Sequence, residues 1–171
     1  MLRENAWKKY DGKQREQIEA FCEDYKNFLT KCKTERECVA ELAAQAEACG
    51  FRRLEDIMQN GRVPVPGDKI YAQAMGKTLV LFQIGREPLE QGMNLLGAHI
   101  DSPRLDLKQN PLYEDGDLAM LETHYYGGVK KYQWVALPLA LHGVVVKKDG
   151  TCVQVVLGED PADPVVGVSD L

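Results

Sequence analysis

The chain has 171 residues, of which 44% are apolar and 27% are charged, the composition of an ordinary globular protein. Its formal net charge is −5, and neither the first 60 residues nor the rest is net positive, so nucleic acid is not expected as a partner. No apolar run approaches the roughly 20 residues of a membrane-spanning helix, and five cysteines without a Cys-x-x-Cys pair suit a reducing compartment. We therefore expect a cytoplasmic protein with no membrane partner.

The first third of the chain has the pattern of two helices. Apolar residues recur at helical spacing between Lys13 and Lys33, which predicts a helix with one buried face. Thr34 and Glu37 have the spacing of a capping box, so a second helix is expected to run from there to about Cys49. This segment predicts a helical layer with no chemistry of its own.

Short strand-like runs follow a loop rich in glycine and proline. Strands are predicted over 70–75 and 78–84, with a hairpin turn at Met75-Gly76-Lys77, and a third strand over 93–100. Helices followed by strands indicate a mixed α/β layer.

The second half of the chain has no helical period beyond Asp106. Strands are expected over 118–126, 134–147 and 151–157, the last two joined by a hairpin at Asp149-Gly150. This pattern predicts a β-rich module that begins near residue 107 and is distinct from the α/β layer.

The residues best suited to chemistry end the third predicted strand. His99 and Asp101 follow an apolar run, and side chains at i and i+2 of a strand point to the same side, so the two can share one pocket. Neutral histidine is a zinc ligand, and its second ring nitrogen usually donates to a carboxylate. His99 is thus a candidate metal ligand, with Asp101 either orienting it or binding the metal directly. The alternative is a histidine that is hydrogen-bonded to an aspartate without any metal.

A second segment, residues 123–134, places aromatic residues around Gly127-Gly128. They could line a substrate pocket or a subunit contact, or they could be a β-hairpin whose aromatic side chains pair across the strands. His124 and His142 are expected to be ordinary strand residues rather than ligands.

Three blocks of sequence, 96–108, 124–134 and 138–147, resemble the aspartyl-aminopeptidase family of zinc peptidases, in its clostridial-type bacterial branch. The resemblance extends over nearly the whole chain. It implies a cytoplasmic exopeptidase that uses two Zn²⁺ ions to remove N-terminal residues from peptides. It also implies a homo-oligomer, built from dimers up to a dodecamer.

The same resemblance implies a fold and site residues. The α/β catalytic domain of such enzymes is phosphorylase/hydrolase-like and is interrupted by a β-rich dimerisation domain. Residues 1–106 then correspond to the N-terminal part of the catalytic domain, and residues 107–171 to part of the inserted dimerisation domain. His99 matches the first metal ligand, and Asp101 matches the catalytic carboxylate that orients it.

Two departures from the family pattern limit what the resemblance implies. Many relatives carry a Trp-Phe-Asp-Arg type segment where this chain has residues 134–138, which lack an acid and an arginine, so a preference for acidic N-terminal residues is not carried over. The family's remaining ligands and its general base lie in a C-terminal portion that this chain lacks. We therefore expect that the chain is the N-terminal portion of a dizinc aminopeptidase and that this portion is inactive alone.

Two alternatives to this function remain open. One is a non-catalytic assembly module derived from such a peptidase, and the other is an α/β domain that binds a small molecule at the double glycine.

Overall fold

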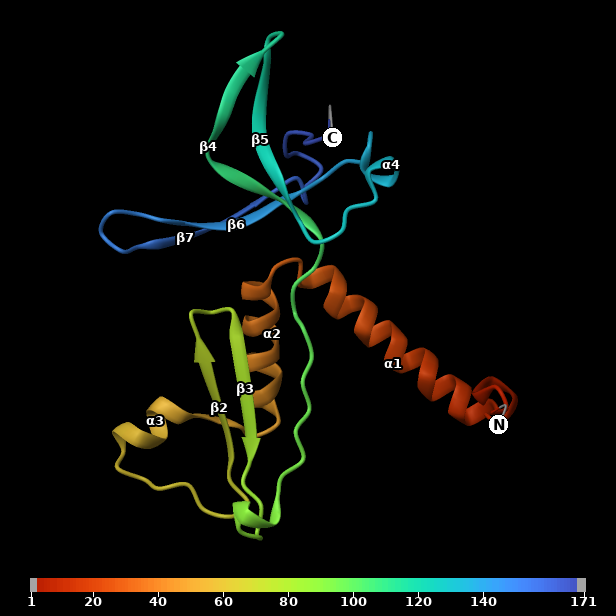
Figure 1. Cartoon of the computed structure of the whole chain (residues 1–171), viewed down its shortest axis with the longest axis vertical. Coiled ribbons are helices and arrows are strands. Elements are labelled where there is room, and N and C mark those ends of the chain that lie inside the picture. The colour runs from red at the N-terminus through yellow and green to blue at the C-terminus, as the bar shows by residue number, and fades with distance from the viewer. Residues whose placement is uncertain (1–2, 169–171) are drawn as a thin grey trace. The chain divides into compact units, whose positions relative to one another are not determined.

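The structure, a computed structural model, describes residues 3–168 and divides into two compact units, residues 1–94 and 95–171 (Figure 1). Within the described residues, no helix combines the length and apolar character needed to cross a bilayer. The division falls after Asn94, ahead of the domain boundary expected after Asp106. The assignment of 1–106 and 107–171 to a catalytic domain and a dimerisation insert stays a prediction.

Two helices form the N-terminal part of the first unit, as predicted. Helix α1 spans Gly12–Lys31 and follows a 3-10 turn at Ala6–Lys8, while α2 spans Glu35–Ala48. The predicted capping box of α2 is confirmed, because the Thr34 hydroxyl accepts from the Glu37 amide and the Glu37 carboxylate accepts from the Thr34 amide.

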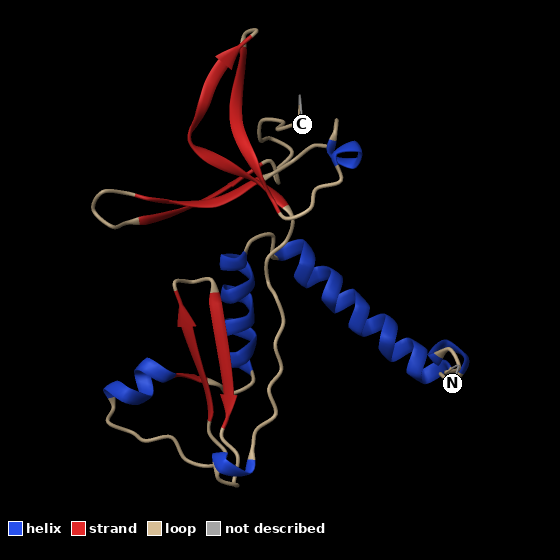
Figure 2. Cartoon of the chain, viewed as in Figure 1, coloured by secondary structure: helices blue, strands red, loops and turns tan. Residues whose placement is uncertain are grey.

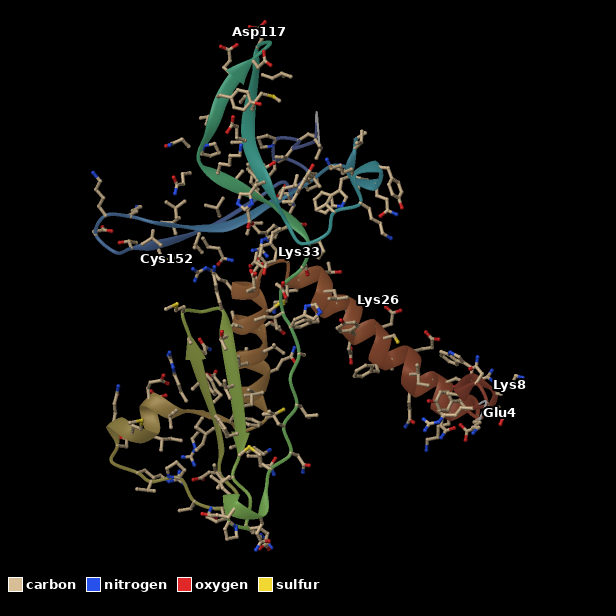
Figure 3. All side chains as sticks on the ribbon, in the orientation of Figure 1. Glu4, Lys8, Lys26, Lys33, Asp117 and Cys152 are labelled. Carbon is tan, nitrogen blue, oxygen red and sulfur yellow. The ribbon has the colours of Figure 1, made fainter. Side chains whose placement is uncertain are left out.

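The predicted burial of one face of α1 is wrong for the described residues. No residue of α1 is buried, and the side chains of Phe21, Tyr25 and Leu29 are all exposed. The reason is the packing of the unit, whose strands contact α2 and the short helix α3, Leu54–Gln59, rather than α1. Figure 1 shows α1 extending away from α2, and the exposed Lys26 is labelled on it in Figure 3.

The first unit contains a three-stranded sheet in the order β1-β2-β3. The strands are β1 Arg52–Arg53, β2 Lys69–Ala74 and β3 Thr78–Gln83. The predicted hairpin between β2 and β3 is confirmed. Three residues, Met75 to Lys77, connect the paired Ala74 and Thr78, and the first two have positive φ, at 52° and 64°.

Val39 of α2 is the anchor of the small core of this unit. Its side chain is 1% exposed, and the core also contains Cys32, Cys38, Ala43, Ala46, Ile57, Ile70 and Tyr71. Val39→Ala is expected to lower the free energy of unfolding by about 2 kcal/mol, since it removes buried methyl groups and leaves a cavity. Urea denaturation followed by circular dichroism measures this. Val63→Ala is the matched control because Val63 is 77% exposed; equal losses in both variants would contradict the assigned core.

Two cysteines of this core are expected to resist alkylation. Burial raises the pKa of the Cys32 thiol to about 11 and also raises the pKa of Cys38, so both stay protonated at pH 8. Cys49, at the end of α2, is exposed. Iodoacetamide should therefore label Cys49 at least about tenfold faster than Cys32 in the native protein, because the thiolate is the reactive form. Peptide mass spectrometry measures the rates. Equal native rates would overturn this prediction, and the rates should converge in denaturant.

The second unit consists of two antiparallel ribbons, shown as strands in Figure 2. Strand β4 spans Arg104–Asp115 and pairs with β5, Leu118–Tyr126, while β6, Leu141–Val146, pairs with β7, Cys152–Leu157. The β4–β5 register shifts between Leu107 and Leu112. Asp117, labelled in Figure 3, lies in the turn at the tip of this ribbon. The strands predicted over 118–126 and 151–157 are confirmed.

Two predicted strands are corrected by the structure. Residues 92–103 are irregular after a 3-10 turn at Leu89–Gln91, because no strand of the described chain pairs with them. The run 134–147 is a strand only over β6. Its start belongs to the short helix α4, Lys131–Trp134, and Pro138 has no amide hydrogen for a ladder.

Of the alternatives for segment 123–134, the β-hairpin at the double glycine is wrong, since Gly127-Gly128 leads into α4 instead of a returning strand. Strand β4 itself was not anticipated from the sequence.

Candidate functional site

His99 and Asp101 lie in the irregular segment that precedes β4, not at the end of a strand. The His99 side chain is 86% exposed and the Asp101 side chain 40% exposed. The two residues are nevertheless brought together as their i, i+2 spacing indicated. The strand expected here is therefore not formed, but the expected proximity of His99 and Asp101 is present.

The contact between them is made through one ring nitrogen. His99 Nδ1 lies 3.1 Å from both the Oδ1 atom and the backbone carbonyl oxygen of Asp101. Both atoms are acceptors, so the geometry suits the tautomer with its proton on Nδ1. That tautomer leaves the lone pair on Nε2, which is the atom available to a metal ion.

Tyr126, at the end of β5, also contacts the Asp101 carboxylate. Its hydroxyl donates to Asp101 Oδ2 over 3.0 Å. This hydrogen bond is the largest cause that lowers the pKa of Asp101, followed by the residue's own backbone amide and by His99. The carboxylate is therefore ionised at neutral pH and accepts from Tyr126 as well as from His99.

The two oxygens of Asp101 thus have different partners, Oδ1 facing the imidazole and Oδ2 facing the phenol. From the sequence, Tyr126 was predicted only as a member of the aromatic segment 123–134, without a contact to Asp101. The residue is far from Asp101 in the chain, and only the pairing of β4 with β5 brings it close, so a sequence signal would have required the strand β4.

The other two histidines lie in strands, as expected. His124 is in β5, with Nδ1 3.2 Å from the carbonyl oxygen of Tyr125, and His142 is in β6, with Nε2 2.9 Å from Glu159 Oε1. Neither approaches the His99 site in a cluster of ligands. Across residues 3–168 no group of three or more His, Cys, Asp or Glu side chains is arranged to hold a metal ion.

The donor chemistry fits zinc, but only in part. An imidazole with a carboxylate on its second nitrogen is a typical zinc ligand. A protein zinc site uses three or four ligands, and no group of three or more candidate ligands is present among the described residues. A complete centre requires further ligands from outside these residues.

Comparison with known proteins places the chain within a family. The family model described as aminopeptidase I zinc metalloprotease (M18) matches residues 28–171. A probable M18 family aminopeptidase 1 from Clostridium acetobutylicum is 65% identical over 98% of this chain and 36% of that protein. The chain therefore spans about 36% of the length of the curated relatives that it matches.

Solved structures show the same likeness. The crystal structure of aminopeptidase I from Borrelia burgdorferi B31 is 40% identical, with a TM-score of 0.89 over 98% of this chain and 41% of that one. A dodecamer structure of yeast mApe1 shares the fold, with 21% identity and a TM-score of 0.69 over 85% of this chain and 34% of that one. The predicted α/β zinc-peptidase fold class and the predicted family are confirmed. The chain belongs to the M18 family of aminopeptidase I zinc metalloproteases.

Proposed function

We propose that this chain is the N-terminal portion of a dizinc aminopeptidase that removes N-terminal residues from peptides. In this proposal His99 is a ligand of one zinc ion, and Asp101 is the carboxylate that orients it. The observation that carries the proposal is the 3.1 Å contact between His99 Nδ1 and Asp101 Oδ1, in a chain of a zinc metalloprotease family.

Zinc, when bound, would polarise the scissile carbonyl and supply a hydroxide nucleophile near neutral pH. The residues of this chain would prepare the ligand. Asp101 accepts a hydrogen bond from the Nδ1–H of His99, which fixes the tautomer and increases the basicity of Nε2. Because the His99 side chain is 86% exposed, Nε2 can meet ligands contributed by other parts of the protein.

We further propose that the rest of the polypeptide supplies the missing ligands and general base. Its packing would also cover the exposed apolar side chains at Phe21 on α1 and at Leu95 and Leu96 beside the site, the last two being 86% and 97% exposed. Residues 1–171 produced alone are expected to show less than about 1% of the full-length peptidase activity, since one ligand does not hold zinc tightly. Hydrolysis assays at equal molar concentration with added zinc measure this. Comparable activity of the short chain would contradict the proposal.

The assembly is a proposal as well. We infer a cytoplasmic homo-oligomer, in which residues 1–106 belong to the catalytic domain and residues 107–171 to a dimerisation insert. Its support is the shared fold with the yeast mApe1 dodecamer and the exposed apolar side chains Leu112 and Leu118 on the β4–β5 ribbon.

The experiment for the function uses the full-length protein. Zinc content is measured by mass spectrometry of the metal. Hydrolysis is measured with leucyl and aspartyl peptides that carry either a free or an acetylated N-terminus. We expect release of N-terminal residues from the free peptides only, with loss of activity on chelation and recovery with zinc. Cleavage that ignores acetylation or chelation would show that the protein is not a zinc aminopeptidase.

A further inference from the structure

We infer that Tyr126 is a positioning residue for the metal centre, whose hydroxyl holds the Asp101 carboxylate in the orientation that fixes His99. The inference rests on the proposed role of His99 as a zinc ligand. It concerns a residue at the end of β5, whose hydroxyl donates to Asp101 Oδ2 and which would act on His99 through Asp101.

Each oxygen of the Asp101 carboxylate faces a different donor. Oδ1 lies 3.1 Å from His99 Nδ1, and Oδ2 lies 3.0 Å from the Tyr126 hydroxyl. Hydrogen bonds on both oxygens fix the plane of the carboxylate as well as its position. The Asp101 side chain is 40% exposed, so without the phenol the carboxylate would be free to rotate and to exchange this partner for water.

Tyr126 is itself held in place by the first pair of the β4–β5 ladder. It lies directly opposite Arg104 in the register, and the Arg104 guanidinium carbon is 3.9 Å from the centroid of its ring. Arg104 Nε in turn donates to Asp106 Oδ1 over 2.7 Å. The Tyr126 ring therefore packs against the Arg104 guanidinium, which is itself held by Asp106 of the same ribbon. This packing limits where the Tyr126 hydroxyl can lie.

The backbone next to Tyr126 is also constrained. Gly127 follows Tyr126 with φ +72°, and a Cβ atom there would lie 3.4 Å from the Cα of Pro103. The end of β5 and the segment that carries Asp101 are therefore in close contact at the backbone. This contact keeps the phenol hydroxyl within reach of the carboxylate.

Tyr125 provides a matched control from the same strand. Neighbouring residues of a strand point to opposite faces, so the Tyr125 side chain is expected on the other face of β5 from Tyr126, and Lys131 Nζ lies 4.9 Å from its ring centroid. Tyr125→Phe and Tyr126→Phe remove the same hydroxyl and keep the same ring, so a difference between them reports the position of the hydroxyl.

The test measures zinc affinity of the full-length protein by competition with a chromophoric chelator, alongside kcat and KM. Tyr126→Phe is expected to weaken zinc binding about tenfold and to lower kcat with little change in KM, whereas Tyr125→Phe stays within about twofold of wild type. Thermal melting of the zinc-free proteins checks that both variants fold. Unchanged zinc affinity and kcat in Tyr126→Phe would overturn the inference.

A double-mutant cycle with Asp101→Ala separates positioning from a merely structural role. Once the carboxylate is absent, adding Tyr126→Phe should have no further effect on zinc affinity. An undiminished tenfold loss in the Asp101→Ala background would overturn the inference, because Tyr126 would then act by another route. A His99→Ala variant in the same assay tests the proposed function itself. Zinc affinity that is unchanged in His99→Ala would show that His99 is not a ligand, whatever the result for Tyr126→Phe.

Discussion

Replacing His99 with alanine in the full-length protein is expected to remove one zinc ion per active site and to lower kcat/KM by about 1,000-fold or more. The imidazole contacts Asp101 Oδ1 through Nδ1 over 3.1 Å, which leaves the lone pair of Nε2 for a metal ion. Its loss leaves the metal with too few ligands. Metal mass spectrometry gives the zinc stoichiometry, and hydrolysis of a leucyl peptide gives kcat/KM.

His124→Ala is the matched control for this experiment. His124 is also exposed and lies in the same unit, but its Nδ1 atom contacts the backbone carbonyl of Tyr125 instead of a carboxylate. We expect normal zinc content and activity for His124→Ala. Normal zinc content and activity in His99→Ala would instead remove the basis of the zinc-site assignment.

Features encoded by neighbouring residues were predictable from the sequence. The Thr34–Glu37 capping box and the turn at Met75-Gly76 each depend on a few adjacent residues, and the structure contains both. The pairing of His99 with Asp101 belongs to the same class, because a side chain two residues away is within reach in an irregular extended segment as well as in a strand.

Features that depend on distant partners were not predictable in the same way. The apolar run before His99 looks like a buried strand, but a strand exists only where another strand accepts and donates its hydrogen bonds, and the described residues provide none there. Leu95 and Leu96 are consequently exposed. The same argument applies to α1, whose apolar face needs a neighbour that the described residues do not supply.

Strand β4 was missed for a local reason. Its sequence contains Pro111, which cannot donate to a ladder, and the register shift between Leu107 and Leu112 accommodates it. Without β4 there was no basis for placing Tyr126 beside Asp101. The part of the site that comes from one segment was therefore predictable, while the part that comes from strand pairing needed the fold.

Asp101→Asn in the full-length protein tests whether the charge of the carboxylate matters, as distinct from its shape. The amide is nearly isosteric, but it is neutral and offers one acceptor oxygen where the carboxylate serves both His99 and Tyr126. Second partners of zinc-bound histidines typically contribute 10–100-fold to metal affinity or activity, so we expect losses of about that size in zinc affinity and kcat. Chelator competition and steady-state hydrolysis measure them.

The control applies the same substitution to a carboxylate away from the site. Asp115 is exposed at the end of β4, and Asp115→Asn should leave zinc affinity and kcat within about twofold of wild type, since surface charges of this kind contribute little. The outcome for Asp101→Asn also separates its two candidate roles. If Asp101 only orients His99, Asp101→Asn should still bind both zinc ions, one of them more weakly. If Asp101 is a direct ligand, Asp101→Asn should lose one zinc ion per active site, as is expected of His99→Ala. Wild-type zinc affinity and kcat in Asp101→Asn would show that the imidazole is held without the carboxylate charge.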